Sequence, residues 1–183
     1  MDERRGHSLG PLIARTYAAH IGSSPPPMLT TLLLLACIGS GLFGGVFFAF
    51  SAFVMKALTE LPAEHGIAAM QRINVVVLNP LFLGVSVGTA LLAGICIVAA
   101  FVSWANARSV LLLTAGAIYL AGSFGVTVVF NVPRNERLAR LGAQTDEAHG
   151  YWPVYVREWL FWNHVRTAAS VVASASSAAA LAY

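Results

Sequence analysis

Residues 159–167, WLFWNHVRT, place four polar side chains at the start of an apolar run that continues to the end of the sequence. If that run spans a bilayer, these side chains lie at or just below the membrane surface, where ionisable groups are costly and usually face a bundle interior or a wet cavity. On a helix Asn163, Arg166 and Thr167 share one face. His164 lies about 100° round the helix from Asn163. We therefore expect the other segments to pack around a polar ring.

Composition places the rest of the chain in lipid. The 183 residues are 57% hydrophobic and 10% charged, with a mean hydropathy of +0.72. An average soluble domain carries about 25% charged residues, so this chain has too little charge to cover a globule in water. The net charge of +3 favours contact with anionic lipid head groups. We expect the lipid bilayer and a hydrophobic small molecule as partners. The sequence has no basic stripe interleaved with aromatic residues, which is the pattern that would indicate a nucleic-acid partner.

Four long apolar segments fit this length, because a span needs about 20 residues. We predict an all-α fold, an integral membrane four-helix antiparallel bundle over residues 28–183. The predicted spans cover residues 28–55, 74–101, 110–130 and 162–183. Residues 1–27 form a predicted flexible N-terminal tail, which ends in a run of three prolines that stops any helix. Met28 follows this run directly and is an alternative start.

The pair Asn79-Pro80 interrupts the second predicted span and allows two interpretations. Asn79 can cap a new helix whose first residue is Pro80, because asparagine is a favoured cap and proline a favoured first residue. Alternatively, Pro80 kinks one continuous helix and frees a backbone carbonyl group. The sequence does not decide between them.

Two further patterns concern packing and loops. The pairs Gly41/Gly45 and Gly84/Gly88 have the spacing at which small residues let membrane helices approach closely. The fourth predicted span is built from alanine, serine and valine, which suits tight burial among neighbouring helices. Residues 144–159 are predicted to form a polar loop, in which Trp152, Tyr155 and Trp159 form an aromatic belt at head-group depth.

Several ordered stretches carry a family resemblance. They are residues 50–55 (FSAFVM), 69–74 (AMQRIN), 78–80 (LNP), 131–133 (NVP) with Asn135, and Trp159 with residues 162–167 (WNHVRT). Together they resemble the anthrone oxygenase-like family of small four-helix membrane proteins, whose bacterial members are mostly uncharacterised. The resemblance covers nearly everything after residue 27. It implies a multi-pass protein of the bacterial inner membrane.

The resemblance also implies a reaction. Family members of fungal polyketide pathways oxidise an anthrone to an anthraquinone with dioxygen and without an evident metal or flavin, so we expect no cofactor and no metal site. Such a reaction needs a base, stabilisation of an oxyanion, and a chamber that excludes water. His164 is the expected base, since neutral imidazole suits proton removal near neutral pH. Arg166 and Arg72 are expected to stabilise the enolate oxygen. The expected amide donors are Asn74, Asn79, Asn131 and Asn163.

Two alternatives remain open at this point. The polar ring can serve only to join helices, with Asn79 and Asn131 bonding the carbonyl groups freed beside Pro80 and Pro133. In that case the chain is a non-catalytic membrane protein that binds a lipid or hydrophobic small molecule, or an accessory subunit of a membrane complex. A metal site is the less favoured alternative, because His164 has no second histidine three or four residues away.

Overall fold

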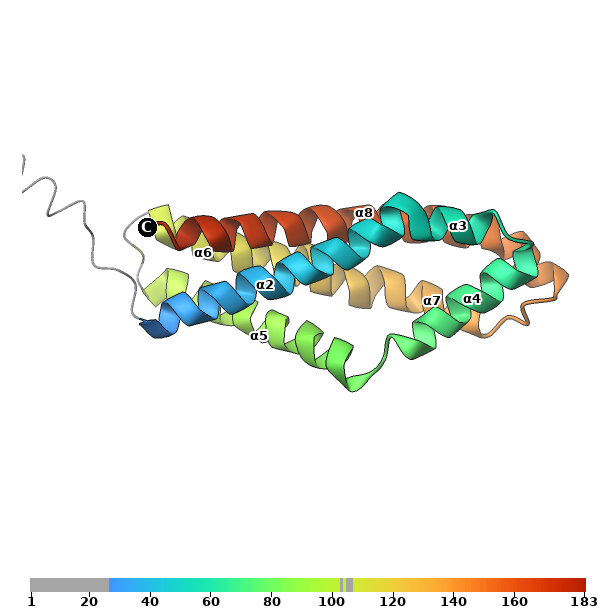
Figure 1. Ribbon diagram of the computed structural model, residues 1–183, viewed down its shortest axis with the longest axis horizontal. Helices are drawn as coiled ribbons and strands as arrows, with labels where there is room; N and C mark the ends of the chain where they lie inside the picture. The colour runs from blue at the N-terminus through green and yellow to red at the C-terminus, as the bar shows by residue number, and fades with distance from the viewer. Residues whose placement is uncertain (1–26, 103, 105–106) are drawn as a thin grey trace, which may run out of the picture.

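Four helical rods lie side by side and alternate in direction in the computed structural model (Figure 1). The structure describes residues 27–102, 104 and 107–183. The predicted tail lies outside these residues, apart from Pro27. The first rod joins α2 (Pro27–Ala49), the π-helix η1 (Phe50–Val54) and α3 (Met55–Thr59). The second is divided between α4 (Ala63–Val76) and α5 (Pro80–Val102).

The third rod contains α6 (Ala107–Ile118), η2 (Tyr119–Gly125), η3 (Thr127–Asn131) and α7 (Val132–Ala139). The fourth rod is the single helix α8 (Asp146–Ala180). The start of α2 and the end of α8 lie at one end of the bundle, and the α3–α4 and α7–α8 connections lie at the other (Figure 1). The predicted all-α antiparallel bundle is confirmed.

Asn79 caps a new helix and does not lie in a kinked one. Its side-chain oxygen accepts a hydrogen bond from the backbone N–H of Phe82 at 3.0 Å, and α5 begins at Pro80. The second predicted span therefore begins too early, because Asn74 belongs to α4. Residues 77–79, which we call the elbow, turn the chain outward between α4 and α5 (Figure 1).

Residues 144–159 are not a loop. Thr145 caps α8 by accepting a hydrogen bond from the N–H of Ala148 at 3.2 Å, and the helix then continues for 35 residues. Trp152, Tyr155 and Trp159 are 6%, 0% and 5% exposed. They pack with residues of α3, α4 and α7 in a second core at the charged end of the bundle. The predicted aromatic belt is wrong, because helical spacing turns these rings towards that core.

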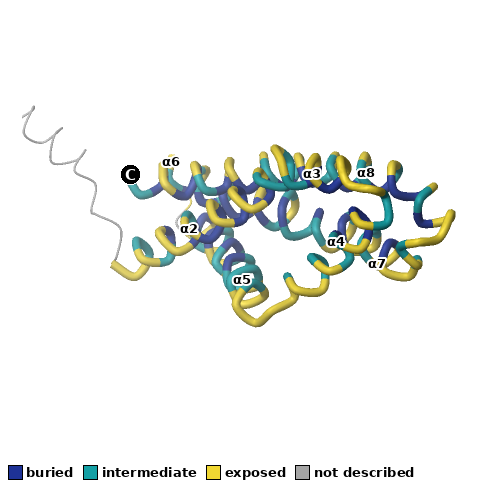
Figure 2. Tube along the Cα trace, turned by 45° about the vertical axis from the view of Figure 1, so that its right-hand side comes forward, coloured by how far each residue is buried: buried dark blue, intermediate teal, exposed yellow. Residues whose placement is uncertain are grey.

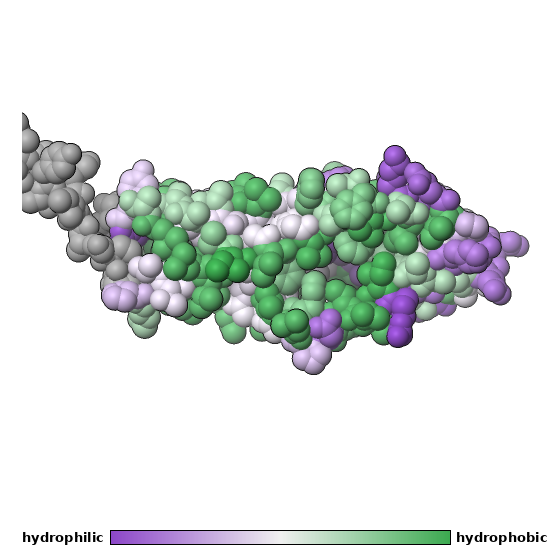
Figure 3. Space-filling model, in the orientation of Figure 1, coloured by the Kyte–Doolittle hydropathy of each residue, from purple (hydrophilic) through white to green (hydrophobic). Residues whose placement is uncertain are grey.

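Three helices among the described residues are long and apolar enough to cross a membrane: Pro27–Thr59, Pro80–Val102 and Ala107–Ala139. This is the pattern of an integral membrane protein. Figure 3 shows a green, apolar middle and a purple, hydrophilic end. A rod of 33 residues is about 50 Å long, whereas the hydrocarbon layer is about 30 Å thick, so the purple end extends beyond it. Helix α8 is less apolar and buries its alanine and serine residues against α2 and α6.

Of the four glycines whose spacing predicted close helix packing, one lies against a neighbouring helix. A Cβ at Gly84, Gly88 or Gly45 would meet nothing within 4 Å, so these three are not close-packing positions. Gly41 does contact α8, where its Cβ would lie 3.3 Å from Ser174. A Cβ at Gly116 would collide with the backbone carbonyl oxygen of Ala93, which shows that α5 and α6 approach closely there.

The contrast between the close approach at Gly116 and the open space at Gly84 gives a prediction about stability. Gly116→Ala should lower the free energy of unfolding by up to about 2 kcal/mol, because an overpacking cost of about 1–3 kcal/mol against the Ala93 backbone outweighs a gain in helix propensity of about 1 kcal/mol. Gly84→Ala is the matched control, and we expect it to be neutral or slightly stabilising. Thermal unfolding of both variants in detergent measures the difference. Equal melting temperatures would contradict the close approach of α5 and α6.

Candidate functional site

A cavity of about 500 Å³ lies beneath the elbow, between the two halves of the second rod and the other three rods. Its volume falls in the range of about 300–1,000 Å³ that is usual for small-molecule sites. Most of its lining is apolar, as such sites require. The clearly polar side chains that line it are Gln71, Asn74, Ser86, Ser123, Thr127, Asn135, Glu136 and Arg166.

Arg166 is a buried cation at this cavity. It is 5% exposed, and it donates hydrogen bonds to Asn163 Oδ1 at 2.6 Å and to Thr127 Oγ1 at 3.3 Å. Its guanidinium carbon lies 4.2 Å from the ring centre of Phe47 and 5.1 Å from that of Trp159. Its buried Nε has no hydrogen-bond partner, and none of the ion pairs among the described residues includes it. The positive charge of Arg166 therefore borders a mostly apolar cavity and takes part in no ion pair.

Asn163 fixes the position of this guanidinium. It is fully buried, and its Nδ2 donates to the backbone oxygen of Phe47 and to Ser51 Oγ, both at 2.7 Å. Its Oδ1 is left to accept from Arg166, one turn further along α8. Asn163 does not line the cavity itself. It is a positioning residue that joins α2, η1 and the cation.

The structure does not bring every predicted residue to the cavity. His164 is exposed on the outer side of α8, and Arg72 is exposed on α4; neither lines the cavity. The expectation that His164 and Arg166 face one chamber is therefore wrong, because a step of one residue turns a side chain by about 100°. His164 has no place as the base of a reaction in this cavity, and Arg72 has none as its second cation.

The three remaining predicted asparagines have different surroundings. Asn74 lines the cavity, and its buried Nδ2 has no hydrogen-bond partner. Asn79 is exposed at the elbow, where it caps α5. Asn131 is 1% exposed and donates to the backbone oxygen of Trp159 at 3.3 Å, while its Oδ1 has no partner. Asn74 is thus the second unsatisfied donor at the cavity, and Asn131 joins η3 to α8.

Several lining residues were not predicted from the sequence. Gln71 donates to the backbone oxygens of Leu138 and Leu141 at 2.8 and 2.9 Å, which ties α4 to the end of α7. The third rod contributes a polar stripe at a spacing of four residues: Ser123, Thr127, Asn131 and Asn135. That spacing was the available signal, because positions four apart share a helix face.

Asn135 holds two aromatic side chains of α8. Its Oδ1 accepts hydrogen bonds from the Tyr155 hydroxyl at 2.9 Å and from Trp159 Nε1 at 3.0 Å. Burial raises the pKa of the Tyr155 phenol above its ordinary value, and the nearby amide of Asn74 partly opposes this. The phenol therefore stays neutral and donates to Asn135. Trp159 in turn forms part of the cavity wall and lies against Arg166.

The acidic side chain that lines the cavity, among the described residues, is Glu136. It is exposed, and its carboxylate lies 3.6 Å from the guanidinium of Arg140 on the surface of α7. The described residues contain no group of three histidine, cysteine or acidic side chains that could hold a metal ion. Glu136 therefore lies between the cavity and the exposed surface of α7.

π-helices form two of the cavity walls. Phe50 belongs to η1, Tyr119 and Ser123 belong to η2, and Thr127 belongs to η3. Such segments are rare, and they occur frequently at functional sites because the extra residue in each turn redirects side chains. Here they bring Thr127 within hydrogen-bond distance of Arg166.

A family model described as Anthrone oxygenase matches residues 79–176, more than half of the chain. The match begins at the cap of α5 and ends in the last turns of α8, so it includes Arg166 and leaves out α2 to α4. Comparisons with curated proteins and with solved structures gave no match.

Proposed function

The chain belongs to the anthrone oxygenase family, and we propose that it is a membrane oxygenase that oxidises an apolar, anthrone-type aromatic with dioxygen and without a bound cofactor. The observation that supports this proposal is the Arg166 guanidinium, which is buried, lacks a carboxylate partner and lines an apolar cavity. A buried charge is costly unless it is paired, so this site favours a ligand that carries or develops negative charge.

An anthrone develops such a charge when it loses a proton. Its methylene group is bonded to the same two aromatic rings as its carbonyl group, so the negative charge left by deprotonation is delocalised through these rings onto the carbonyl oxygen. In our proposal Arg166 and the free Nδ2 of Asn74 donate to that oxygen. Donors aimed at a developing oxyanion in a site that excludes water are a large source of rate acceleration. The same contacts favour the anion over the neutral ketone.

The proposed reaction then proceeds on the substrate carbon. The anion transfers electrons to dioxygen and a C–O bond forms, which gives a peroxide anion at the former methylene carbon. The proton taken from the methylene group then returns to this peroxide and gives a hydroperoxide. Loss of the remaining hydrogen from that carbon, with cleavage of the O–O bond, releases water and leaves a second carbonyl group. One anthrone and one dioxygen thus give one anthraquinone and one water. Dioxygen is the oxidant, and the substrate supplies all the electrons.

Glu136 is the proposed proton acceptor in place of His164. It is the acidic group at the cavity, and its exposed carboxylate can pass the proton on to water. General base catalysis by a positioned side chain contributes about 10²–10⁴-fold. The apolar walls of the cavity would exclude water from around the flat substrate. Water would otherwise weaken each polar contact between the substrate and the protein.

Oxygen uptake by the purified protein in lipid nanodiscs tests this function. With anthrone, we expect uptake above the rate in empty nanodiscs, with one dioxygen consumed for each anthraquinone formed. Glu136→Gln should lower kcat by about 10²-fold, whereas His164→Ala should stay within about twofold because its ring lies outside the cavity. Glu60→Gln, at an exposed acid that directly follows α3, is the control. Full activity in Glu136→Gln would show that Glu136 is not the base. Loss of activity in His164→Ala would show that His164 acts as the base after all.

The second candidate is a non-catalytic protein that binds a lipid or hydrophobic small molecule. The same observation supports it, because an unpaired Arg166 would also hold an anionic lipid head group. Mass spectrometry of molecules that copurify with the protein separates the two candidates. A stoichiometric anionic lipid, together with no oxygen uptake, would favour the binding protein.

A further inference from the structure

The cavity has an apolar opening between the second and third rods. Helix α5 packs against α6 and η2, and α4 packs against α7, but the first half of α5 departs from the third rod beside η3. The cavity is lined there by exposed side chains of both rods: Leu83, Val87, Val128 and Val132, with exposed fractions of 42%, 49%, 52% and 38%. We call this opening the α5–η3 window.

The window lies at the depth of the hydrocarbon layer. Val87 and Val128 belong to helices long and apolar enough to span a membrane. Val87 precedes the end of α5 at Val102 by 15 residues, or about 22 Å of helix. Arg166 precedes the end of α8 at Ala180 by 14 residues, or about 21 Å, and both helices end on the same side of the bundle (Figure 1). The window and the cation therefore lie at similar depth, within a layer about 30 Å thick.

The elbow above the window is also apolar on its outside. Leu78 in the elbow and Val75, Val76 and Leu81 beside it are between 54% and 78% exposed, and the elbow region is drawn mostly as exposed in Figure 2. Contiguous apolar surface of this kind is unfavourable in water and marks contact with a membrane or partner. Lipid is the surrounding that suits both the elbow and the window rim.

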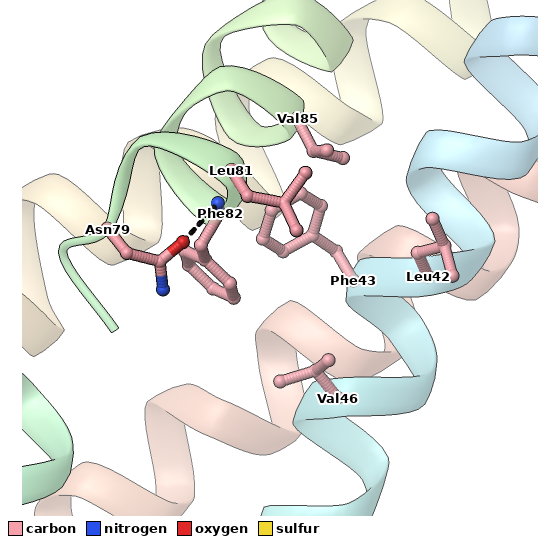
Figure 4. Close-up of a pocket in the computed structure, with 7 residues that line it drawn as sticks. All are labelled: Leu42, Phe43, Val46, Asn79, Leu81, Phe82 and Val85. Carbon is pink, nitrogen blue, oxygen red and sulfur yellow. Dashed lines mark hydrogen bonds between the residues drawn. The ribbon is translucent and has the colours of Figure 1, made fainter. Parts of the chain in front are cut away.

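A second hollow adjoins the cavity between α2 and α5. This groove of about 240 Å³ lies between α2 and α5 and shares Phe43, Val46 and Phe82 with the cavity. In Figure 4 the rings of Phe43 and Phe82 lie between the two helices. They meet edge to face with centroids 5.1 Å apart, so they form a partition. A substitution that fills this groove therefore serves as a control for a substitution that narrows the window.

We propose that the cavity is loaded sideways from the bilayer through the α5–η3 window. The ligand class is an uncharged, planar aromatic molecule that is dissolved in the lipid and acquires negative charge only beside Arg166. An apolar rim admits the neutral form and disfavours the anion, because an ion pays a large cost to enter a low-dielectric layer. The inference rests on the proposed function only in treating the cavity as a ligand site.

Binding kinetics in phosphatidylcholine nanodiscs test the route, with 1,8-dihydroxyanthraquinone as a coloured probe of the product type. Val128→Trp should narrow the window and slow both association and dissociation by about tenfold, while Kd changes less than about threefold. Val129→Trp is the matched control, since Val129 is 60% exposed on the same helix and does not line the cavity. Val85→Trp fills the α2–α5 groove and should also leave the rates unchanged.

The outcomes separate the route from the function. Unchanged rates in Val128→Trp, or slowing by Val85→Trp instead, would overturn the assigned route, as would the absence of saturable binding by the unaltered protein. If Val128→Trp does not fold, Val87→Trp narrows the same window from α5 and has the same expected result. Saturable binding through the window without oxygen uptake would contradict only the proposed oxygenase function.

Discussion

Arg166→Met should reduce oxygen uptake with anthrone by about 10²–10³-fold and leave the protein folded. A single donor to a developing oxyanion is worth that much in an enclosed site, and Arg166 is the cation that lines this cavity among the described residues. Methionine keeps much of the apolar volume of the side chain and removes the charge. We expect kcat to fall more than KM rises, because the interaction strengthens as charge develops on the substrate.

The fold should survive this substitution because opposing contributions to stability nearly cancel. Burying a cation costs several kcal/mol. Hydrogen bonds of a charged group return about 1.5–3 kcal/mol, and a desolvated cation–π contact returns about 2 kcal/mol. Arg166 makes contacts of both kinds, with Asn163 and with Phe47. Its removal also leaves the buried Asn163 Oδ1 without a donor, at a cost of about 1–3 kcal/mol, so we expect the free energy of unfolding to fall by no more than about 3 kcal/mol.

A second measurement distinguishes an anion-binding Arg166 from a structural one. The visible spectrum of bound 1,8-dihydroxyanthraquinone reports the ionisation of its phenol, and a nearby cation should lower the pKa of that phenol by one unit or more. The shift should vanish in Arg166→Met and persist in Arg157→Met, which removes an exposed arginine of the same helix. An unshifted probe in the unaltered protein, or unfolding of Arg166→Met, would assign Arg166 a structural role.

The sequence was most informative where local chemistry decides the structure. Asn79-Pro80 offered a cap or a kink, and the resemblance to the anthrone oxygenase family extended through this pair; the structure selects the cap. The apolar runs predicted the three helices that are long and apolar enough to cross a membrane, because hydropathy over about 20 residues is a strong signal; the predicted span 162–183 is not among them. The sequence also predicted that Arg166 faces a bundle interior, and Arg166 is 5% exposed.

The sequence was misleading where tertiary packing decides the structure. Helical phase separates His164 from Asn163 and Arg166, but only contacts with α2 and η3 show which of the two faces is interior. The polar residues of 144–159 indicated a loop. Instead, most of them form the first turns of α8, because that helix buries one face in a separate core with α3, α4 and α7. Likewise, Gly84 and Gly88 have packing spacing but no neighbour, because α5 leans away from the bundle there.

Asn135→Ala should be the most destabilising substitution at the site. It leaves the Tyr155 hydroxyl and the Trp159 indole N–H, both on buried side chains, without their acceptor. Each orphaned buried donor costs about 1–3 kcal/mol, so we expect a loss of about 2–6 kcal/mol in the free energy of unfolding. Thermal unfolding followed by tryptophan fluorescence measures it. Probe binding should weaken as well, since Trp159 forms a cavity wall and supports Arg166.

Asn135→Asp is the matched control, because it keeps an acceptor oxygen at the same position and removes only the amide nitrogen. At neutral pH it should preserve most of the stability that Asn135→Ala loses, since a carboxylate accepts both hydrogen bonds. If the two variants unfold alike, the contribution of Asn135 lies in its amide nitrogen and not in its bonds to Tyr155 and Trp159. If neither variant is destabilised, the core at the charged end holds α8 without this network, and the cavity wall depends on packing alone.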